Sequence, residues 1–360
     1  MKILIVNGLF LPYLNGTVVY FRNFFRELIR QGHEVTMVAG GAQEKRENYE
    51  DMDLIIFEKP KSGLPLLESK KYYSERAYEK VKKLRNESFD LIISGGDIFL
   101  PGLKRLFDKN KIIYISPGIQ DIDLNSHDKE TVLQRKKEMI SDIEGVKIIT
   151  LSKSLKDDYK KHFGRINDVY VIPPGVDINY DLKKERKNEV LFVGRISPEK
   201  NIEALISAFE KINSGKLIIV GGGSGLDELK TKISKSPRIK DIKIVGKIDN
   251  PKSYYENAKV FVLPSRHESF GLVLIEAMAA ELPCIAFRSD GKDIVTASED
   301  IIENERTGFL VKDEKEMMEK INLLLFDEKL RKKMGKAARK EVKKYSWENA
   351  VKSILKFAMV

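Results

Sequence analysis

The chain has 360 residues, of which 42% are hydrophobic and 33% charged, and its formal net charge is +10 at pH 7. This length exceeds the size at which a single hydrophobic core usually stops growing, so two domains are expected. The apolar content is too high for a disordered protein. Cys284 is the single cysteine, which excludes an intrachain disulfide and a cysteine-based zinc site and favours a cytoplasmic protein.

Two features of the sequence bear on membranes. The first apolar run, KILIVN, lacks the basic region and the cleavage site of a signal peptide, so it is predicted to be a buried strand. No run approaches the ~20 apolar residues that a spanning helix needs. We therefore expect a soluble protein that does not cross a membrane.

Much of the excess positive charge lies in two segments. Residues 59–85 contain nine basic and three acidic side chains, interleaved with leucines and tyrosines, and residues 329–344 contain nine basic and one acidic. Such a segment favours contact with an anionic membrane surface, here the inner face, with 59–85 the stronger candidate. The alternative is an ordinary solvated helix face. Nucleic-acid binding is not predicted, because no reading motif accompanies the charge.

Strand-like runs alternate with helix-like segments through most of the chain, a pattern typical of parallel βαβ units. In the first series a strand at 2–7 precedes a helix from about 15 to 30. The remaining strands of this series are predicted at 34–40, 91–94, 111–116 and 147–152. Each ends in small or polar residues, where the ligand site of such a sheet would lie.

A second series follows the charged segment 181–189, which has no apolar periodicity and is interpreted as a linker. Its strands are predicted at 190–194, 216–223, 242–246, 259–265 and 283–287. The predicted domains are therefore 1–180 and 181–344. The final segment, 345–360, is a short amphipathic helix that could pack back on the first domain or on the second. The predicted fold class is α/β, with two doubly wound Rossmann-like domains facing across a cleft.

The segment from Pro264 to Phe287 carries the first chemical signal. A strand ends, a polar loop follows, and a helix begins near Phe270, so the N–H groups of Phe270, Gly271 and Leu272 are expected at a positive helix end that suits a diphosphate. Gly271 permits close approach of a ligand. Glu276 can accept hydrogen bonds from ribose hydroxyls, and Glu268 lies on the loop. The alternative is a capping loop with two solvated glutamates.

A pair of cations carries the second signal. Arg195 directly follows a predicted strand, and Lys200 stands five residues later near a helix start. Together they can stabilise the charge that grows on a leaving diphosphate without a metal ion. Taken alone, the two residues could equally be surface charge at a strand end and a helix cap.

Four further segments add to the pattern set by these two. They are GTVVYFRNFFRELIRQGHEV, TLSKSLKDDYKKHFG, VIPPGVDI and the ending KKYSWENA. The whole set resembles glycosyltransferase family 4, retaining enzymes of the GT-B fold, from Met1 to about residue 350. The two glutamates with seven residues between them, followed inside by FG, form a specific motif in this setting.

The resemblance implies a set of roles. Arg195 and Lys200 would hold the donor diphosphate, Glu276 the ribose, and Glu268 with the amides of 270–272 the transferred sugar. Gly16 would approach the phosphate from the first domain. Lys247 and Ile248 would line the base pocket. No metal or other cofactor is implied.

The sequence departs from the family at several points. Asn15 precedes Gly16 where the family often has a second glycine, and the helix end usually closed by glycine reads Ala280, Glu281, Leu282. The stretch 290–306 is longer than usual. Many members place a histidine near the position of Gly118. None of the four histidines (His33, His127, His162, His267) is at that position, so no catalytic histidine is nominated.

Three other motifs compete. GGGSG at 221–225 invites a dinucleotide site, but Leu226 stands where the third glycine is required. Asp-x-Asp strings occur at 51–53 and 121–123, yet a chain this rich in aspartate yields about one by chance, so they are weak evidence for a metal. Asp97 ends a strand and either faces the acceptor or caps the next helix.

The leading hypothesis is retaining transfer of a hexose from a nucleotide diphosphate sugar, with a uridine diphosphate sugar favoured, to a hydroxyl of a glycan or lipid. One alternative is a sugar-nucleotide epimerase of related fold, which would consume donor without an acceptor. Another is a nucleotide-sugar binding protein without transfer activity, which the missing histidine favours. The donor base, the acceptor and the oligomeric state stay open.

Overall fold

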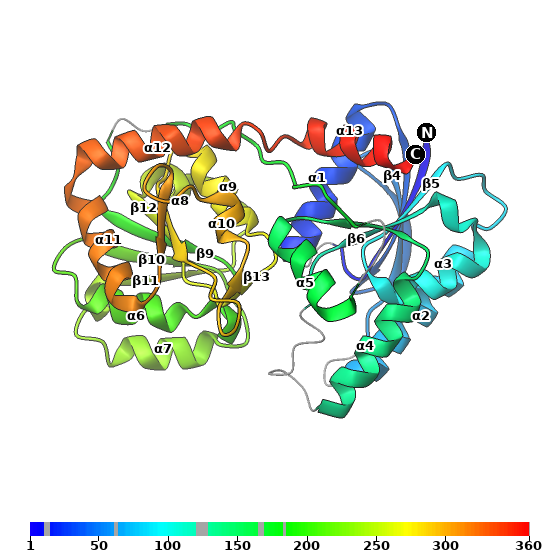
Figure 1. Cartoon of the computed structure of the whole chain (residues 1–360), viewed down its shortest axis with the longest axis horizontal. Coiled ribbons are helices and arrows are strands. Elements are labelled where there is room, and N and C mark those ends of the chain that lie inside the picture. The colour runs from blue at the N-terminus through cyan, green and yellow to red at the C-terminus, as the bar shows by residue number, and fades with distance from the viewer. Residues whose placement is uncertain (11–14, 61–63, 120–128, 165–168, 183–184, 360) are drawn as a thin grey trace. The chain divides into compact units, whose positions relative to one another are not determined.

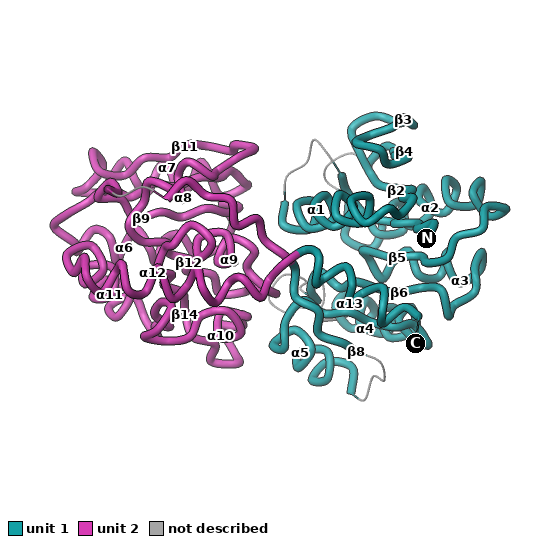
Figure 2. Tube along the Cα trace, turned by 90° about the horizontal axis from the view of Figure 1, so that it is seen from above, with its two compact units in different colours: residues 1–174, 347–360 teal, residues 175–346 magenta. Residues whose placement is uncertain are grey.

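A computed structural model describes residues 1–10, 15–60, 64–119, 129–164, 169–182 and 185–359. The chain divides into two compact units, which Figure 2 colours separately: Met1–Pro174 with Trp347–Val360, and Gly175–Ser346. The boundaries predicted from the sequence are 180–181 and 344–345. The last helix therefore belongs to the first unit.

The first unit is built on an eight-stranded sheet in the order β3-β4-β2-β1-β5-β6-β7-β8. Every neighbouring pair is parallel except β3 with β4, which is antiparallel. The strands are β1 Lys2–Asn7, β2 Glu34–Gly41, β3 Lys45–Tyr49, β4 Met52–Glu58, β5 Leu91–Ser94, β6 Ile112–Ser116, β7 Lys147–Thr150 and β8 Val169–Val171. Without β3, the order corresponds to a doubly wound sheet, whose switch point lies between β1 and β5.

Helices cover both faces of this sheet (Figure 1). They are α1 Gly16–Arg30, α2 Leu66–Lys82, α3 Leu100–Leu106, α4 Lys129–Ile143, α5 Lys153–Phe163 and α13 Trp347–Ala358. Side chains of α2, α3, α4 and α5 share one hydrophobic cluster with the strands. On α1, Tyr20 contacts Trp347 of α13 edge-on, with the ring centroids 5.3 Å apart. The C-terminal helix thus packs back on the first unit, through its only tryptophan.

The second unit contains a six-stranded sheet in the order β11-β10-β9-β12-β14-β16, with all neighbouring pairs parallel. The strands are β9 Glu189–Val193, β10 Lys216–Val220, β11 Ile242–Gly246, β12 Val260–Leu263, β14 Cys284–Phe287 and β16 Gly308–Val311. This is the doubly wound order, and its switch point lies between β9 and β12. A separate two-stranded ribbon pairs β13 His267–Glu268 with β15 Val295–Thr296.

The helices of the second unit pack on both faces of its sheet. They are α6 Ile202–Glu210, α7 Leu226–Ser234, α8 Lys252–Asn257, α9 Leu272–Ala279, α10 Ser298–Ile301, α11 Glu314–Phe326 and α12 Glu328–Val342. Helix α11 packs on α6, whereas α12 and α10 pack on α9. Every strand predicted from the sequence is present. The structure adds β3, β4, β8, β16 and the short ribbon, of which the ribbon matters most for the site.

Candidate active site

The candidate site of the second unit lies where β9, β10, β11 and β12 end (elements labelled in Figure 1). In an open parallel sheet, ligands bind outside the carboxyl ends of the strands at the switch point. The loops that begin at this edge start at Gly194, Gly221, Lys247 and Pro264. The fold therefore gathers segments that are distant in sequence.

The glycine run at 221–225 packs against the loop that follows β9. A Cβ atom on Gly221, whose φ is +150°, would lie 1.8 Å from the carbonyl oxygen of Gly194, and one on Gly223 would lie 2.2 Å from that of Ile196. Ile196 also donates its N–H to Gly222 and accepts from Gly225, at 3.0 and 3.1 Å. These glycines are needed for close packing of two loops, which accounts for them without a dinucleotide.

Lys200 and Glu268 form an ion pair between Nζ and Oε2. Lys200 ends the single 3₁₀ turn Pro198–Lys200, while Glu268 lies on β13. Their side chains are only 16% and 15% exposed. The two loops are also joined through the backbone, because the N–H of Arg266 donates to the carbonyl of Glu199 at 2.8 Å. Two residues predicted separately as donor-site residues are thus brought into contact.

The side chain of Arg195 is more exposed than that of Lys200 and pairs with a different carboxylate. Its Nη2 donates to Oε1 of Glu199 at 2.6 Å, and the hydroxyl of Ser197 donates to the same oxygen at 2.6 Å. Burial opposes the charge of Glu199, but the hydrogen bonds from Ser197 and the backbone, together with Arg195, hold its pKa below the usual range. The Arg195 side chain is 59% exposed. Glu199, which is not among the predicted site residues, orients this cation.

The short ribbon fixes the strand that bears Glu268. Val295 donates its N–H to the carbonyl of Arg266 at 2.7 Å, and Ala297 donates to that of Glu268 at 2.9 Å. Both donors come from the stretch 290–306, which is longer than usual for the family. Strands of two residues carry no detectable alternation, so the sequence offers no signal for this contact.

The helix start after Glu268 has the form expected for an anion site. Helix α9 begins at Leu272, two residues later than predicted, with Gly271 as its N-cap at φ +95°. A Cβ atom on Gly271 would meet Cγ of Glu268 at 3.3 Å. Within the described residues, the N–H groups of Phe270, Gly271 and Leu272 do not donate to a backbone carbonyl.

The ring of Phe270 packs inside the unit, whereas its backbone amide belongs to the helix start. The residue is 4% exposed, and its ring packs edge-on against Tyr345 at 5.8 Å. The hydroxyl of Tyr345 in turn donates to the carbonyl of Asp300 at 3.2 Å. Phe270 therefore anchors the loop through its side chain and leaves only its backbone N–H for a ligand.

Glu276 accepts a hydrogen bond from the hydroxyl of Tyr255, at 2.8 Å. Tyr255 lies on α8 and is buried, and burial together with the charge of Glu276 raises its pKa well above the usual value. The tyrosine therefore keeps its proton and stays a donor. Tyr180 contacts Tyr255 edge-on at 6.2 Å. Neither tyrosine was predicted, because no motif links them to Glu276.

Lys247 and Ile248 follow β11 at the same edge of the sheet. Gly221 donates its N–H to the carbonyl of Gly246 at 2.9 Å. A Cβ atom on Gly222 would lie 3.6 Å from Cβ of Lys247. Lys247 is exposed and Ile248 half-buried. Lys247 therefore flanks the glycine run, and Ile248 is the next residue along the chain.

The remaining predicted residues belong to the first unit. Gly16 is the first residue of α1, whose N-cap Asn15 accepts from Val18 N–H at 2.9 Å. Asp97 is 6% exposed and forms an ion pair with Arg135, which is 1% exposed. The carboxylate is thus engaged inside the unit rather than open to solvent.

The surroundings of Gly118 contain hydroxyl groups. Gly118 donates its N–H to Oγ of Ser116 at 3.3 Å, and the hydroxyl of Tyr159 donates to the same atom at 2.8 Å. Among the histidines, His33 contacts the N-terminal amine at 3.3 Å, and His127 lies outside the described residues. No replacement for the family histidine is assigned.

Helix α2 makes up most of the basic segment 59–85. Ala77 and Val81 are buried, and the ring of Tyr73 packs on Phe57 at 6.0 Å. The apolar side of this helix therefore faces the sheet, while Leu64 before it is 42% exposed. Residues 61–63 lie outside the described part. No described helix combines the length and apolarity needed to cross a membrane.

The described ranges contain no group of three His, Cys, Asp or Glu side chains that is arranged to hold a metal ion. Of the two Asp-x-Asp strings, 121–123 lies outside those ranges. In the other, Asp53 is paired with Arg46 at 2.7 Å.

Two family matches divide the chain almost where the structure does. Residues 14–180 match Glycosyltransferase Family 4, and residues 177–341 match Glycosyl transferases group 1. Each match covers less than half of the chain, but together they extend over residues 14–341. The two matches support a GT-B glycosyltransferase of group 1.

The curated relatives differ in the fraction of their length that matches this chain. An uncharacterized glycosyltransferase of Methanocaldococcus jannaschii is 28% identical over 100% of this chain and 99% of its own length. A sulfoquinovosyl transferase of Arabidopsis thaliana is 34% identical over 46% of this chain, and the match covers 32% of that transferase. The matched region therefore spans about a third of the plant relative.

Solved glycosyltransferases share the fold. The sucrose-phosphate synthase of Thermosynechococcus elongatus superposes with a TM-score of 0.85, covering 99% of this chain and 97% of that one at 21% identity. HepE of Anabaena in complex with UDP-glucose gives 0.78, with 99% and 98% covered at 17% identity. The predicted α/β class with two doubly wound GT-B domains is confirmed, while the cleft between them stays a prediction.

Proposed function

We propose that this chain is a retaining glycosyltransferase that moves a hexose from a nucleotide diphosphate sugar to a hydroxyl of a glycan or lipid. The observation that carries the proposal is the ion pair of Lys200 with Glu268 beside the start of α9. A cation, a carboxylate and the N–H groups of a helix start, gathered at one sheet edge, suit a diphosphate joined to a sugar.

The chemistry follows from these groups. The acceptor oxygen forms a bond to the anomeric carbon on the face from which the diphosphate departs. The bond between that carbon and the phosphate oxygen breaks, and a phosphate oxygen takes the acceptor proton. Lys200, Arg195 and the amides of 270–272 stabilise the growing charge on the leaving group. No metal ion is needed in this scheme.

Donor binding requires the ion pair to rearrange. The diphosphate attracts Lys200, and the sugar hydroxyls then supply the hydrogen bonds that Glu268 loses. Glu276, held by Tyr255, accepts from the ribose hydroxyls. Lys247 and Ile248 border the base. Gly16, in the first unit, would approach the phosphate.

A uridine diphosphate sugar is the favoured donor. HepE, a protein of the same fold, was solved with UDP-glucose. Calorimetry with UDP, GDP and ADP tests the base, and NMR of the product's anomeric centre tests retention. Equal affinity for all three nucleotides, or an inverted product, would contradict these parts of the proposal.

A second candidate function follows from Gly118, which stands where the family often has a histidine. This second candidate is a nucleotide-sugar binding protein without transfer activity. Donor binding without turnover across a broad acceptor panel would favour it, whereas slow donor hydrolysis would count against it. Consumption of donor into a second sugar nucleotide without acceptor would instead indicate an epimerase.

We also propose a cytoplasmic protein that touches the inner membrane face through 59–85. The exposed Lys71 and Arg76 support an electrostatic contact, because the apolar residues of α2 are turned inward. Flotation with anionic vesicles tests this contact. Equal flotation with neutral vesicles, or none, would contradict it.

A further inference from the structure

A hollow of about 720 Å³ opens in the second unit, away from the candidate active site. Four lysines line it: Lys187, Lys216, Lys240 and Lys243. They come from the segment before β9, from β10, from the turn before β11 and from β11 itself. The sequence motifs assign no role to this cluster.

The hollow exists because one face of the sheet is incompletely covered. On that face Lys216 pairs in register with Glu189, and Lys243 pairs with Ile218. Helix α8, which packs on β9, has only six residues and is therefore about 9 Å long. It leaves β10 and β11 open beside it, so lysines project where a longer helix would bury apolar residues.

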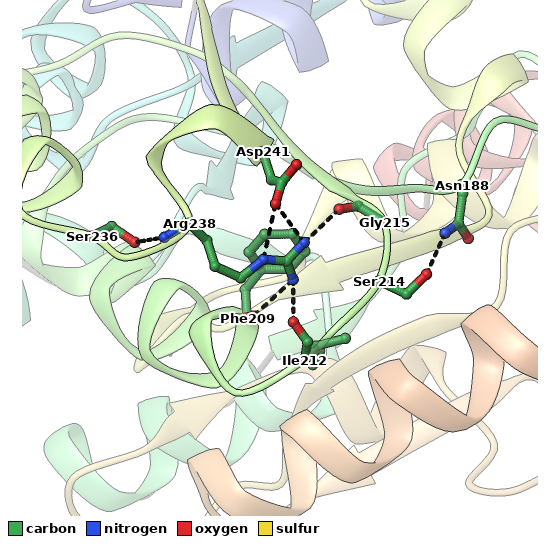
Figure 3. A network of polar contacts seen from close by, with 8 residues as sticks. All are labelled: Asn188, Phe209, Ile212, Ser214, Gly215, Ser236, Arg238 and Asp241. Atoms are coloured by element: carbon green, nitrogen blue, oxygen red, sulfur yellow. Dashed lines mark hydrogen bonds and ion pairs between the residues drawn. The ribbon is translucent and has the colours of Figure 1, made fainter.

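The acidic residues around the hollow do not neutralise these lysines. Asp241 is taken by Arg238, whose Nη2 and Nε donate to its Oδ2 at 2.9 and 3.1 Å (Figure 3). Arg238 also donates to the carbonyl of Gly215 at 2.8 Å and lies 4.2 Å from the ring centroid of Phe209. Asp241 is thus committed to a network that holds two loops together.

Within the described ranges, none of the four lysines has an ion-pair partner. Glu189 is the remaining carboxylate on the lining. The hollow therefore presents four cations against one uncommitted anion. The hydroxyls of Ser253 and Tyr254 on α8 add neutral hydrogen-bond donors.

We infer that this hollow binds a compact oligophosphate, a ligand with two or three linked phosphate groups. Lysine binds phosphate as a point charge, and several ammonium groups around one volume match several phosphates. The volume falls in the range of small-molecule sites. This chemistry is shared by inorganic tripolyphosphate and by the phosphate chain of a nucleoside triphosphate.

The inferred site is separate from the candidate active site. Lys216 is the first residue of β10, whereas the glycine run begins after its last residue, Val220. Five residues of strand span roughly 13 Å between their end Cα atoms. The two sites therefore lie at opposite ends of the same sheet, so both can be occupied together.

Calorimetric titration of tripolyphosphate into the full chain, with UDP at saturation, tests the inference. We expect binding in the wild type and a loss of about tenfold or more in Lys216→Ser/Lys243→Ser, because two nearby charges are removed. The matched control is Lys235→Ser/Lys336→Ser, which removes two exposed lysines elsewhere in the unit. That control should bind as the wild type does.

A second pair of variants tests whether removing a negative charge from the hollow tightens tripolyphosphate binding. Glu189→Gln should tighten tripolyphosphate binding severalfold, whereas Glu228→Gln on the exposed side of α7 should not. Titrating Lys200→Ala in parallel separates this site from the donor site. No wild-type binding in the presence of UDP, equal loss in both double variants, or loss in Lys200→Ala alone would overturn the inference.

The source of the phosphate chain is settled by a parallel titration with ATP. Tighter binding of ATP than of tripolyphosphate, lost in Lys216→Ser/Lys243→Ser, supports the site and indicates a nucleotide. Equal affinity of the two ligands also supports it and indicates recognition of the phosphate chain alone. Melting temperatures of all variants confirm that the loss of binding is not a loss of folding.

Discussion

Lys200 and Glu268 form an ion pair although they lie 68 positions apart in sequence. One closes the turn after β9 and the other lies on the short strand β13. Because both side chains are largely buried, removing one partner leaves an uncompensated charge. Stability and turnover are therefore linked at this pair, and variants must separate them.

Lys200→Met should lower kcat by a hundredfold or more, about 3 kcal/mol, while weakening donor binding far less. The reason is that a cation beside the leaving group matters most as its charge grows. The check is steady-state kinetics with varied donor at saturating acceptor. Arg195→Ala should act in the same direction.

The double variant Lys200→Met/Glu268→Gln is the control for a structural role. It removes both charges, so its melting temperature should return toward that of the wild type. Its turnover should stay low. If the double variant recovers both activity and stability, the catalytic role of both residues is contradicted. If Glu268→Gln alone keeps wild-type activity and stability, the place of Glu268 beside the sugar is contradicted.

Glu276→Gln should raise the donor KM with little change in kcat, because contacts to the ribose are nearly uniform along the reaction. Tyr255→Phe should weaken donor binding by about 1 kcal/mol, since it removes the hydrogen bond that orients Glu276. Kinetics of the two single variants and their double measure the coupling. Fully additive losses would show that Tyr255 does not act through Glu276.

The sequence predicts most strands of the two sheets, because each of those strands is an apolar run between turn signals. It does not predict β3, β4, β8 and β16, and the sequence of β3, KRENY, contains no apolar run. The sequence also places Arg195, Lys200, Glu268 and Glu276 at one sheet edge, since the carboxyl ends of parallel strands lie together.

Other contacts escape the sequence because they depend on packing between distant segments. The pairing of β13 with β15 rests on two residues each, too few for a periodic signal. Tyr255 on α8 donates to Glu276 on α9 across 21 positions of sequence, and no motif links the two residues. Asp97 could cap a helix or face a ligand, and only the buried Arg135 shows where its charge is compensated.

Gly223→Ala should destabilise the protein by about 1–3 kcal/mol and lower turnover, because the new Cβ would lie 2.2 Å from the carbonyl of Ile196. The displaced loop carries Arg195 and Lys200. Gly222→Ala is the matched control, since its nearest neighbour would be Cβ of Lys247 at 3.6 Å. Denaturant unfolding and kinetics of both variants check this. Equal effects at the two positions would contradict the packing role.

Activity should persist in excess chelator, because Lys200, Arg195 and the start of α9 supply the positive charge at the diphosphate. The measurement is the initial rate before and after exhaustive treatment with EDTA. A loss of activity that manganese alone restores would contradict the proposed scheme. It would also direct attention to the Asp-x-Asp strings at 51–53 and 121–123.

Asp142 predicts a pH dependence of stability. Burial raises the pKa of this carboxyl to about 6 from the ordinary 3.8, against the attraction of Arg135. Between these values the folded protein holds a proton that the unfolded chain has lost. The stabilisation from this group is therefore complete below about pH 4 and is lost as pH rises through about 6.

Asp142→Asn should accordingly stabilise the protein at pH 7 to 8 and leave it almost unchanged near pH 4. The gain is about 1 kcal/mol, a value discounted because the side chain is partly exposed to solvent. Urea unfolding across this pH range measures it. The matched control is Asp157→Asn, the same substitution at an exposed position of α5. A constant difference between Asp142→Asn and the wild type at every pH would show that the carboxyl titrates normally.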